Sequence, residues 1–334
     1  MNRMASVQSG TVQARVMHRD DAADEYAPEI SVVIATRGRS RELQECLEAL
    51  EKQSFYDFEI VVVDSAPADG DETNREIAKK FNAKYVCVTR IGSSRARNQG
   101  AKEASGKIIA LTDDDAQPEP EWLVRIHEEM KDESVAAVVG KTAAIASDSQ
   151  ASKDFERAGG FVNGGSERSV ITKETPGWFP LVAFHGLGML ANMAVRRSFF
   201  LRKSSEGWSG FDERLGRGSV IHGYDENLAL FSLVHEGNKI VYSPDIVVRH
   251  PGPNSVDELK NEMRMNRSAS AAFFLLLKWE YPSCWGKLTR HLWGKLFSSS
   301  SSSEQFPEIS FSLWERIVDR ARGVGWYLKS VFDL

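Results

Sequence analysis

Short apolar runs alternate with stretches of helical spacing between residues 30 and 139. The run 30–36 is typical of a buried strand, and the apolar positions from Leu43 to Leu50 then repeat at the spacing of one helix face. Further strands are predicted at 58–64, 85–89, 108–112 and 135–139, and further helices at 72–81, 93–104 and about 121–131. This alternation predicts an α/β fold with a mostly parallel central sheet and helices on both faces.

Polar side chains recur at the carboxyl ends of the predicted strands. They are Thr36 and Arg37, Asp64, Arg90, and the run from Asp113 to Asp115. In sheets of this kind ligands bind outside the carboxyl ends of the strands. We therefore expect the binding site at this edge of the sheet.

The pattern is less regular after residue 139. Residues 145–180 are rich in glycine, serine and charge, which predicts irregular structure. Regular patterns return at 189–200, 224–235 and 240–250. We expect residues 29–250 to form one domain, preceded by a flexible tail over 1–28.

The composition changes after Pro251. Residues 256–297 are typical of helices, a serine run at 298–303 predicts a linker, and a last helix is expected at about 311–331. The sequence thus predicts a C-terminal helical extension over 251–334.

Aromatic and basic residues are interleaved in this extension. They are Trp279, Trp285, Trp293, Lys287, Arg290, Lys295, Arg320, Arg322 and Lys329. Such a composition suits an amphipathic helix on an anionic membrane surface. Packing against the rest of the protein, or a homodimer interface, explains the same residues.

The overall composition excludes several classes of protein. The chain has 334 residues, a hydrophobic fraction of 42% and a net charge of −5, which gives no reason to expect a nucleic-acid partner. The three cysteines form neither a disulfide framework nor a zinc pattern and fit a reducing compartment. Residues 1–27 lack an apolar signal segment, and no apolar run reaches the length of a membrane span. We therefore expect a cytoplasmic protein, with the C-terminal helices as the part that could hold it at the inner face of the cell membrane.

Three consecutive aspartates, Asp113 to Asp115, close the apolar run 108–112. Carboxylates packed this closely repel one another, and a divalent cation with oxygen ligands relieves that repulsion. An acidic turn that caps the next helix is the structural alternative. The cation interpretation also supplies a way to hold a phosphorylated ligand at the sheet edge.

Two common phosphate-binding loops are excluded. The turn from Thr36 to Arg39 has one glycine where a dinucleotide fingerprint needs three. The triplet Gly140-Lys141-Thr142 resembles the end of a P-loop, but Val135 stands where the first glycine is required. What remains is a device of metal and carboxylates on a parallel sheet.

At this point the motifs resemble those of family 2 glycosyltransferases of the GT-A fold. The matching segments, in order, are 31–36, 61–64, 92–100, 113–115, 191–197, 210–216, 223–228 and 247–250. The resemblance covers residues 29–250, and it implies a nucleotide-binding half over 29–118 and an acceptor-binding half over 119–250.

The resemblance also implies roles for individual residues. Thr36 and Asp64 would contact the base of a nucleotide sugar, and Asp113 would lie near the ribose. Asp115 would bind Mn²⁺ or Mg²⁺, and His250 would complete that site. Four further residues would line the same nucleotide-sugar pocket: Arg37, Arg90, Arg97 and Asp114.

The catalytic base implied by the resemblance is Asp225. The family usually has Glu-Asp here, whereas this chain has Tyr224-Asp225-Glu226, so Glu226 is a rival base. A sugar hydroxyl must lose its proton as it attacks, and a carboxylate opposite the leaving group would make the reaction inverting. Acids in the first turn of a helix also favour its dipole, which is the structural alternative for both residues.

Trp208 and His185 flank the later motifs and are candidates for the acceptor site, because an aromatic face can support a sugar. Core packing is the alternative for the tryptophan.

Together these features predict an inverting, metal-dependent glycosyltransferase. The expected donor is a nucleotide sugar, with a UDP-sugar favoured, and the expected acceptor is a saccharide or a lipid-linked molecule in bacterial polysaccharide assembly. A nucleotidyltransferase and a non-catalytic nucleotide-sugar-binding protein are the alternatives.

Overall fold

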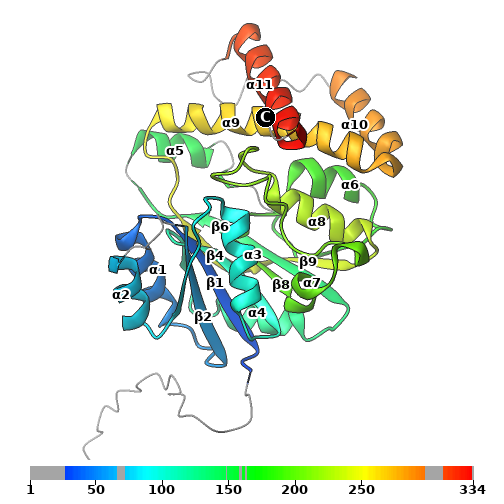
Figure 1. The fold of residues 1–334 in the computed structure, drawn as a ribbon. Coiled ribbons are helices and arrows are strands. Elements are labelled where there is room, and N and C mark those ends of the chain that lie inside the picture. The colour runs from blue at the N-terminus through cyan, green and yellow to red at the C-terminus, as the bar shows by residue number, and fades with distance from the viewer. Residues whose placement is uncertain are drawn as a thin grey trace, which may run out of the picture.

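The structure is a computed structural model that describes residues 27–65, 72–147, 149–157, 160–161, 164–297 and 311–332. It contains a nine-stranded sheet in the order β3-β2-β1-β4-β8-β6-β9-β5, with β7 paired to β9. Figure 1 shows helices against the sheet and a separate group of C-terminal helices. Most of the predicted N-terminal tail and the predicted serine linker lie outside the described residues.

The first half of the sheet is parallel, as the sequence predicts. β1 (Ile30–Thr36) pairs with β2 (Phe58–Asp64) and β4 (Ile108–Asp113), and β2 pairs with β3 (Lys84–Cys87). The crossover helices are α1 (Ser40–Leu50), α2 (Glu72–Lys80) and α3 (Ser93–Glu103). These connections bring the carboxyl ends of β1, β2 and β4 together at one edge.

Alternate side chains of β1 enter two different core layers. Ile30, Val32 and Ile34 pack in the layer that contains the buried face of α1, whereas Val33 packs in the layer that contains α3. α3 approaches the sheet closely at Gly100, where a Cβ atom would lie 2.3 Å from Val33 Cγ1. A strand buried on both faces explains the nearly continuous apolar run.

The second half of the sheet is mixed. β8 (Met193–Arg196) runs antiparallel to β4 and to β6 (Val135–Ala144), and β9 (Lys239–His250) runs parallel to β6. The short strands β5 (Gln117–Pro118) and β7 (Ser169–Ile171) are antiparallel to β9. The sheet is therefore parallel in the half that the sequence pattern resolved and mixed beyond it.

The helices of the second half include several short ones. They are α4 (Trp122–Met130), α5 (Gln150–Arg157), α6 (Trp178–Pro180), η1 (Leu181–His185), η2 (Leu190–Asn192), α7 (Arg197–Leu201), η3 (Ser204–Glu206) and α8 (Asp225–His235). The prediction of irregular structure over 145–180 was wrong in part, because α5, β7 and α6 fall within that range. β7 is too short to leave a periodic pattern, and it depends on pairing with β9.

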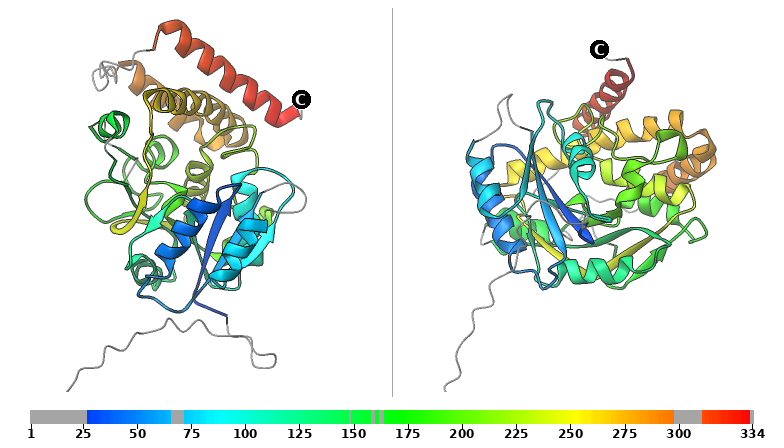
Figure 2. Two further views of the ribbon diagram at one scale, coloured as in Figure 1. Left: turned by 90° about the vertical axis from the view of Figure 1, so that its left-hand side faces the viewer. Right: turned by 60° about the horizontal axis from the view of Figure 1, so that its bottom comes forward.

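The predicted C-terminal extension is present as α9 (Val256–Glu280), η4 (Pro282–Cys284), α10 (Trp285–Phe297) and α11 (Leu313–Phe332). The Ser255 side chain caps α9 by accepting a hydrogen bond from the Glu258 amide. α11 packs along α9 and lies on its outer side (Figure 2). None of the described helices is both long enough and apolar enough to span a bilayer.

Gly323 lies where α11 contacts α9: a Cβ atom there would be 2.0 Å from the Ser268 carbonyl oxygen. We expect Gly323→Ala to push the helices apart and lower the free energy of unfolding by roughly 1–3 kcal/mol. Gly325 of the same helix has open space around it, so Gly325→Ala is the control and should raise stability by up to about 1 kcal/mol. Urea denaturation followed by circular dichroism measures both, and equal effects would contradict the close contact.

Candidate active site

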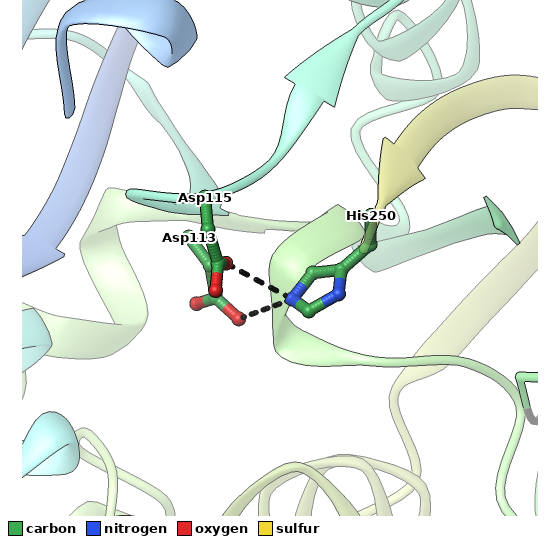
Figure 3. A group of neighbouring side chains, drawn as sticks. All are labelled: Asp113, Asp115 and His250. Atoms are coloured by element: carbon green, nitrogen blue, oxygen red, sulfur yellow. Dashed lines mark ion pairs between the residues drawn. The ribbon is translucent and has the colours of Figure 1, made fainter. Parts of the chain in front are cut away.

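Two aspartates and a histidine meet at the carboxyl-end edge of the sheet. Asp113 ends β4, Asp115 follows in the turn, and His250 ends β9. His250 Nε2 lies 3.1 Å from Asp115 Oδ1 and 3.7 Å from Asp113 Oδ2. Figure 3 shows the His250 ring pointing toward the two carboxylates. Burial alone would lower the pKa of His250, but the two carboxylates raise it to about 10. The cluster thus holds a positive charge between two negative ones.

This donor set suits a divalent cation. One ligand atom from each of Asp113, Asp115 and His250 lies within 4.8 Å of the others. Carboxylate oxygens suit Mg²⁺ and Mn²⁺, and imidazole nitrogen is a common ligand of transition metals. The structure thus groups Asp113 with the two predicted metal ligands, whereas the sequence placed it near the ribose.

Asp114 belongs to a different set of contacts. Its Oδ2 accepts a hydrogen bond of 2.8 Å from Thr36 Oγ1, and its Oδ1 lies 3.2 Å from Arg39 Nη1. The same nitrogen of Arg39 lies 2.7 Å from Asp115 Oδ2. Burial raises the pKa of Asp114 to about 6, although Thr36 and Arg39 act in the opposite direction. One arginine therefore ties the buried aspartate to the metal-binding cluster.

We expect Asp114→Asn to raise the free energy of unfolding at neutral pH by roughly 2 kcal/mol. Folding raises the pKa of Asp114 from its usual value near 4 to about 6. Protonated Asp114 therefore contributes to the free energy of unfolding. This contribution is fully present below the pKa of the unfolded state and is lost as the pH rises through the pKa of the folded state. Asparagine keeps an acceptor for Thr36 without a charge.

Urea denaturation of both proteins with EDTA, at about pH 4 and about pH 8, tests this expectation. The variant should gain stability over the natural chain only at the higher pH. The same gain at both values would show that charge at this position is not the cause.

Arg97 connects the acidic cluster to the predicted base. Its Nη2 lies 2.6 Å from Asp113 Oδ1 and its Nη1 lies 3.4 Å from Asp225 Oδ2. The hydroxyl of Ser94 lies 3.1 Å from the same Asp225 oxygen and 2.8 Å from the Leu215 carbonyl. The structure therefore brings Asp113 and Asp225, far apart in the sequence, to two ends of one guanidinium group.

The backbone around Asp225 is tightly constrained. Tyr224 adopts a left-handed conformation with φ +64°, which turns the chain into the first residue of α8. A Cβ atom at Gly216 would lie 2.6 Å from Asp225 Oδ2, and Gly216 itself has φ +98°. Only glycine fits at that position without displacing the carboxylate.

Glu226 lies beside Asp225 and is half-buried. Burial raises the pKa of Glu226 well above its usual range, and the neighbouring Asp225 raises it further. Both effects disfavour the charged carboxylate, which is the form that a general base needs before it can accept a proton. The structure therefore favours Asp225 of the two candidates.

Asp64 is fully buried at the end of β2. Its Oδ2 accepts hydrogen bonds from Asn74 Nδ2 at 2.9 Å and from the Tyr85 hydroxyl at 2.8 Å. Its Oδ1 has no hydrogen-bond partner among the described residues. A buried carboxylate oxygen with unused acceptor capacity is suited to an N–H group of a ligand.

Four other predicted site residues lie outside these contacts. Arg37 and Arg90 are exposed, and so is His185 on η1. Trp208 is 7% exposed and packs edge-on against Phe200 and Phe211. The acceptor role predicted for Trp208 has no support in this packing, because its ring is part of the core.

Sequence reasoning missed two residues of the site, Arg39 and Ser94. Arg39 contacts the second and third aspartates, and Ser94 contacts the candidate base. Only the position of Arg39 in the turn after the first strand, and of Ser94 at the start of α3, could have indicated them.

The model of the family Glycosyl transferase family 2 matches residues 31–190. Glycosyltransferase AglE of Haloferax volcanii is 34% identical over 106 residues, which cover 29% of this chain and 34% of that protein. Dolichol-phosphate mannosyltransferase of Pyrococcus furiosus is 32% identical over 112 residues, which cover 33% of this chain and 32% of that protein. The chain matches about a third of the length of these curated relatives.

Two solved structures resemble the whole chain. TarS 1–349 of S. aureus in complex with UDP-GlcNAc has a TM-score of 0.55 and 16% identity, over 91% of this chain and 81% of that one. Mannosyltransferase PcManGT of Pyrobaculum calidifontis, in complex with GDP-Man and Mn²⁺, has a TM-score of 0.50 and 17% identity, over 92% and 88%. Residues 31–190 therefore match glycosyl transferase family 2, and the fold of the chain is the GT-A fold.

Proposed function

We propose that this protein transfers a sugar from a nucleotide-sugar donor to a hydroxyl group, with inversion at the anomeric carbon. One observation carries the proposal: Arg97 joins Asp113 of the acidic cluster to Asp225. A group that holds a diphosphate and a group that accepts a proton would thus lie side by side. The match of residues 31–190 to a glycosyltransferase family supports the same reaction.

The donor is proposed to be a UDP-sugar. The free Oδ1 of Asp64 could accept the N–H of a uracil ring, with Thr36 close by at the end of β1. TarS is described with UDP-GlcNAc, which supports the choice, whereas PcManGT is described with GDP-Man, which makes GDP the alternative.

Asp113, Asp115 and His250 are proposed to hold Mn²⁺ or Mg²⁺, which when bound would offset the charge of the departing diphosphate. Arg39 adds a positive charge at the rim of the same cluster. Its side chain is 46% exposed, so a phosphate group could reach it from solvent.

Asp225 is proposed to take the proton of the acceptor hydroxyl. The hydroxyl oxygen bonds to the anomeric carbon as the bond from that carbon to the diphosphate oxygen breaks, and the nucleoside diphosphate leaves. Attack opposite the leaving group inverts the configuration. Arg97 and Ser94 contact Asp225 and would hold its carboxylate in place.

The acceptor is proposed to be a saccharide or a lipid-linked molecule. Two relatives support these two classes by their names. Chondroitin synthase of Escherichia coli, which is 30% identical, is named for a polysaccharide, and the dolichol-phosphate mannosyltransferase described above is named for a lipid-linked molecule. Both matches cover about a third of this chain. Assembly of a bacterial polysaccharide is the proposed context.

Thermal unfolding with UDP, GDP and dTDP, each with and without Mn²⁺, tests the proposal. A ligand that binds only the folded protein raises the melting temperature, and we expect the largest rise with UDP and Mn²⁺ together. Asp64→Asn should remove most of that rise, because an amide N–H₂ in place of Oδ1 cannot accept a hydrogen bond from the base.

Consumption of UDP-sugars by the natural chain is measured in parallel. No shift with any nucleoside diphosphate, together with no donor turnover, would overturn the proposed function. A shift with GDP alone would overturn the choice of uridine.

A further inference from the structure

The outer face of α11 is apolar. A helix on the surface of a globular protein normally buries its apolar side and exposes its polar side. In α11 the buried residues are Asp319, Gly323 and Tyr327, which face α9. The exposed apolar side chains are Leu313, Trp314, Ile317, Val318, Val324, Leu328, Val331 and Phe332.

These side chains form one continuous stripe. At 3.6 residues per turn they fall within less than half of the helix circumference, opposite the residues that contact α9. Trp314 and Phe332, near the two ends of the helix, are 71% and 63% exposed. α11 is about 30 Å long, because each of its 20 residues adds about 1.5 Å. The stripe is far larger than the scattered apolar residues of an ordinary surface.

The charges of α11 are sorted in the same way. Both acids face the protein: Asp319 pairs with Arg267 at 2.5 Å, and Glu315 pairs with Arg264. Three exposed cations flank the stripe, with Arg320 on one side and Arg322 and Lys329 on the other. Among the described residues of α11, its outer half therefore presents apolar and positive groups and no negative one.

We propose that α11 docks the protein on an anionic lipid bilayer, lying in the plane of the surface. Helices of this kind bury an apolar face at the boundary of headgroups and acyl chains and place Lys and Arg beside it. Trp314 at the end of the stripe is suited to the same boundary. The proposal goes beyond sugar transfer, and the docking itself does not depend on catalysis.

A second copy of the chain would cover the apolar stripe of α11 less well than a lipid surface does. In a two-fold dimer the same patch meets itself, so the stripe of one copy would face the stripe of the other. The arginines that flank both stripes, Arg320 and Arg322, would then approach cations of the partner, which is unfavourable. An anionic lipid surface complements both the stripe and its flanks.

The docking helix also contacts the loop that leads to the candidate base. The ring of Trp326 in α11 lies 5.1 Å from that of His222, and Phe273 in α9 stacks on Tyr224 at 4.8 Å. His222 and Tyr224 belong to the loop that ends at Asp225. Docking through α11 would therefore hold this loop close to the bilayer, where an acceptor anchored in lipid would be found.

The test measures binding of the full chain to vesicles of phosphatidylcholine and to vesicles of phosphatidylcholine mixed with phosphatidylglycerol. We expect binding to the anionic vesicles, weaker binding at high salt and little binding to the neutral ones. Ile317→Gln combined with Leu328→Gln should weaken binding by about tenfold or more. Glutamine favours helix, so the double variant should keep its fold.

Leu201→Gln is the control, because Leu201 is 54% exposed, somewhat more than Ile317 at 46% and Leu328 at 44%, but lies on α7. It should bind vesicles like the natural chain. UDP-induced thermal shifts should be the same in all three proteins, so a failure of docking is distinguishable from a failure of the proposed function.

Three results would overturn the proposal: no binding of the natural chain to anionic vesicles, equal binding to neutral ones, or undiminished binding of the double variant. Analytical ultracentrifugation tests the alternative, a dimer of the chain, by measuring its oligomeric state. A dimer of the natural chain that the double variant loses, without vesicle binding, would assign the stripe to a second copy.

Discussion

Replacing Asp225 with asparagine is expected to lower the rate of sugar transfer by a factor of about 10²–10⁴, the usual contribution of a general base. The amide keeps the size of the side chain and an oxygen for the contacts with Ser94 and Arg97. It cannot take a proton from the acceptor. Donor binding, measured as the thermal shift with UDP and Mn²⁺, should therefore be retained while turnover is lost.

Glu226→Gln is the control for this prediction. Burial and the neighbouring Asp225 raise the pKa of Glu226 well above its usual range and so favour the neutral, protonated form of its side chain over the charged one. Glutamine resembles that neutral form, so turnover should change by less than about tenfold. A large loss in Glu226→Gln with little loss in Asp225→Asn would exchange the roles of the two residues.

The first half of the fold could be predicted because its apolar patterns are local. β1 is buried on both faces, and α1 repeats apolar residues at helical spacing. The direction of β8 could not be predicted in this way. Its alternation of side chains is the same in a parallel and an antiparallel strand, and its direction depends on the long connection between β6 and β8, which contains α5, β7 and α6.

The carboxylates of the site could also be predicted, because like charges in sequence must find a partner. The arginine that contacts them could not. Gly38, with φ +62°, turns the chain after β1, and Arg39 then reaches Asp114, 75 residues away in sequence. Arg37 is also exposed but forms no ion pair with the described residues. Nothing local distinguishes the two arginines, since their difference comes from a turn and a distant partner.

Aromatic residues show the same limit. Sequence placed Trp208 at an acceptor site, yet Phe200 and Phe211 enclose it in the core. The composition of the C-terminal extension indicated an amphipathic helix, but only the structure shows that Asp319, Gly323 and Tyr327 of α11 face α9. Whether an aromatic side chain is buried depends on tertiary packing that a single sequence does not specify.

Asp115→Asn is expected to weaken Mn²⁺ binding and to lower sugar transfer by about a hundredfold or more, since a metal site of this kind supplies several kcal/mol of charge stabilisation. EDTA should have the same effect on the natural chain, and added Mn²⁺ should reverse it. Isothermal titration calorimetry measures the metal, and donor consumption measures the transfer. Unchanged Mn²⁺ affinity in Asp115→Asn would contradict the assignment of this ligand.

The pH dependence of metal binding identifies the histidine ligand. Without metal the pKa of His250 is raised to about 10, so the imidazole carries a proton at neutral pH. A metal ligand must be neutral imidazole, and binding therefore releases that proton. Below the pKa the affinity for Mn²⁺ should rise with pH, by up to about tenfold per unit.

His250→Gln should bind Mn²⁺ more weakly, and its affinity should not rise with pH between about pH 7 and pH 8. This range lies above the pKa of Asp114, which is about 6, so that Asp114 does not titrate within it. Calorimetry in buffers of different ionisation enthalpy counts the protons released. Equal proton release from both proteins would mean that His250 is not the group displaced by the metal. In the natural chain, one proton released per ion bound would mean that the metal replaces the positive charge His250 now places between Asp113 and Asp115.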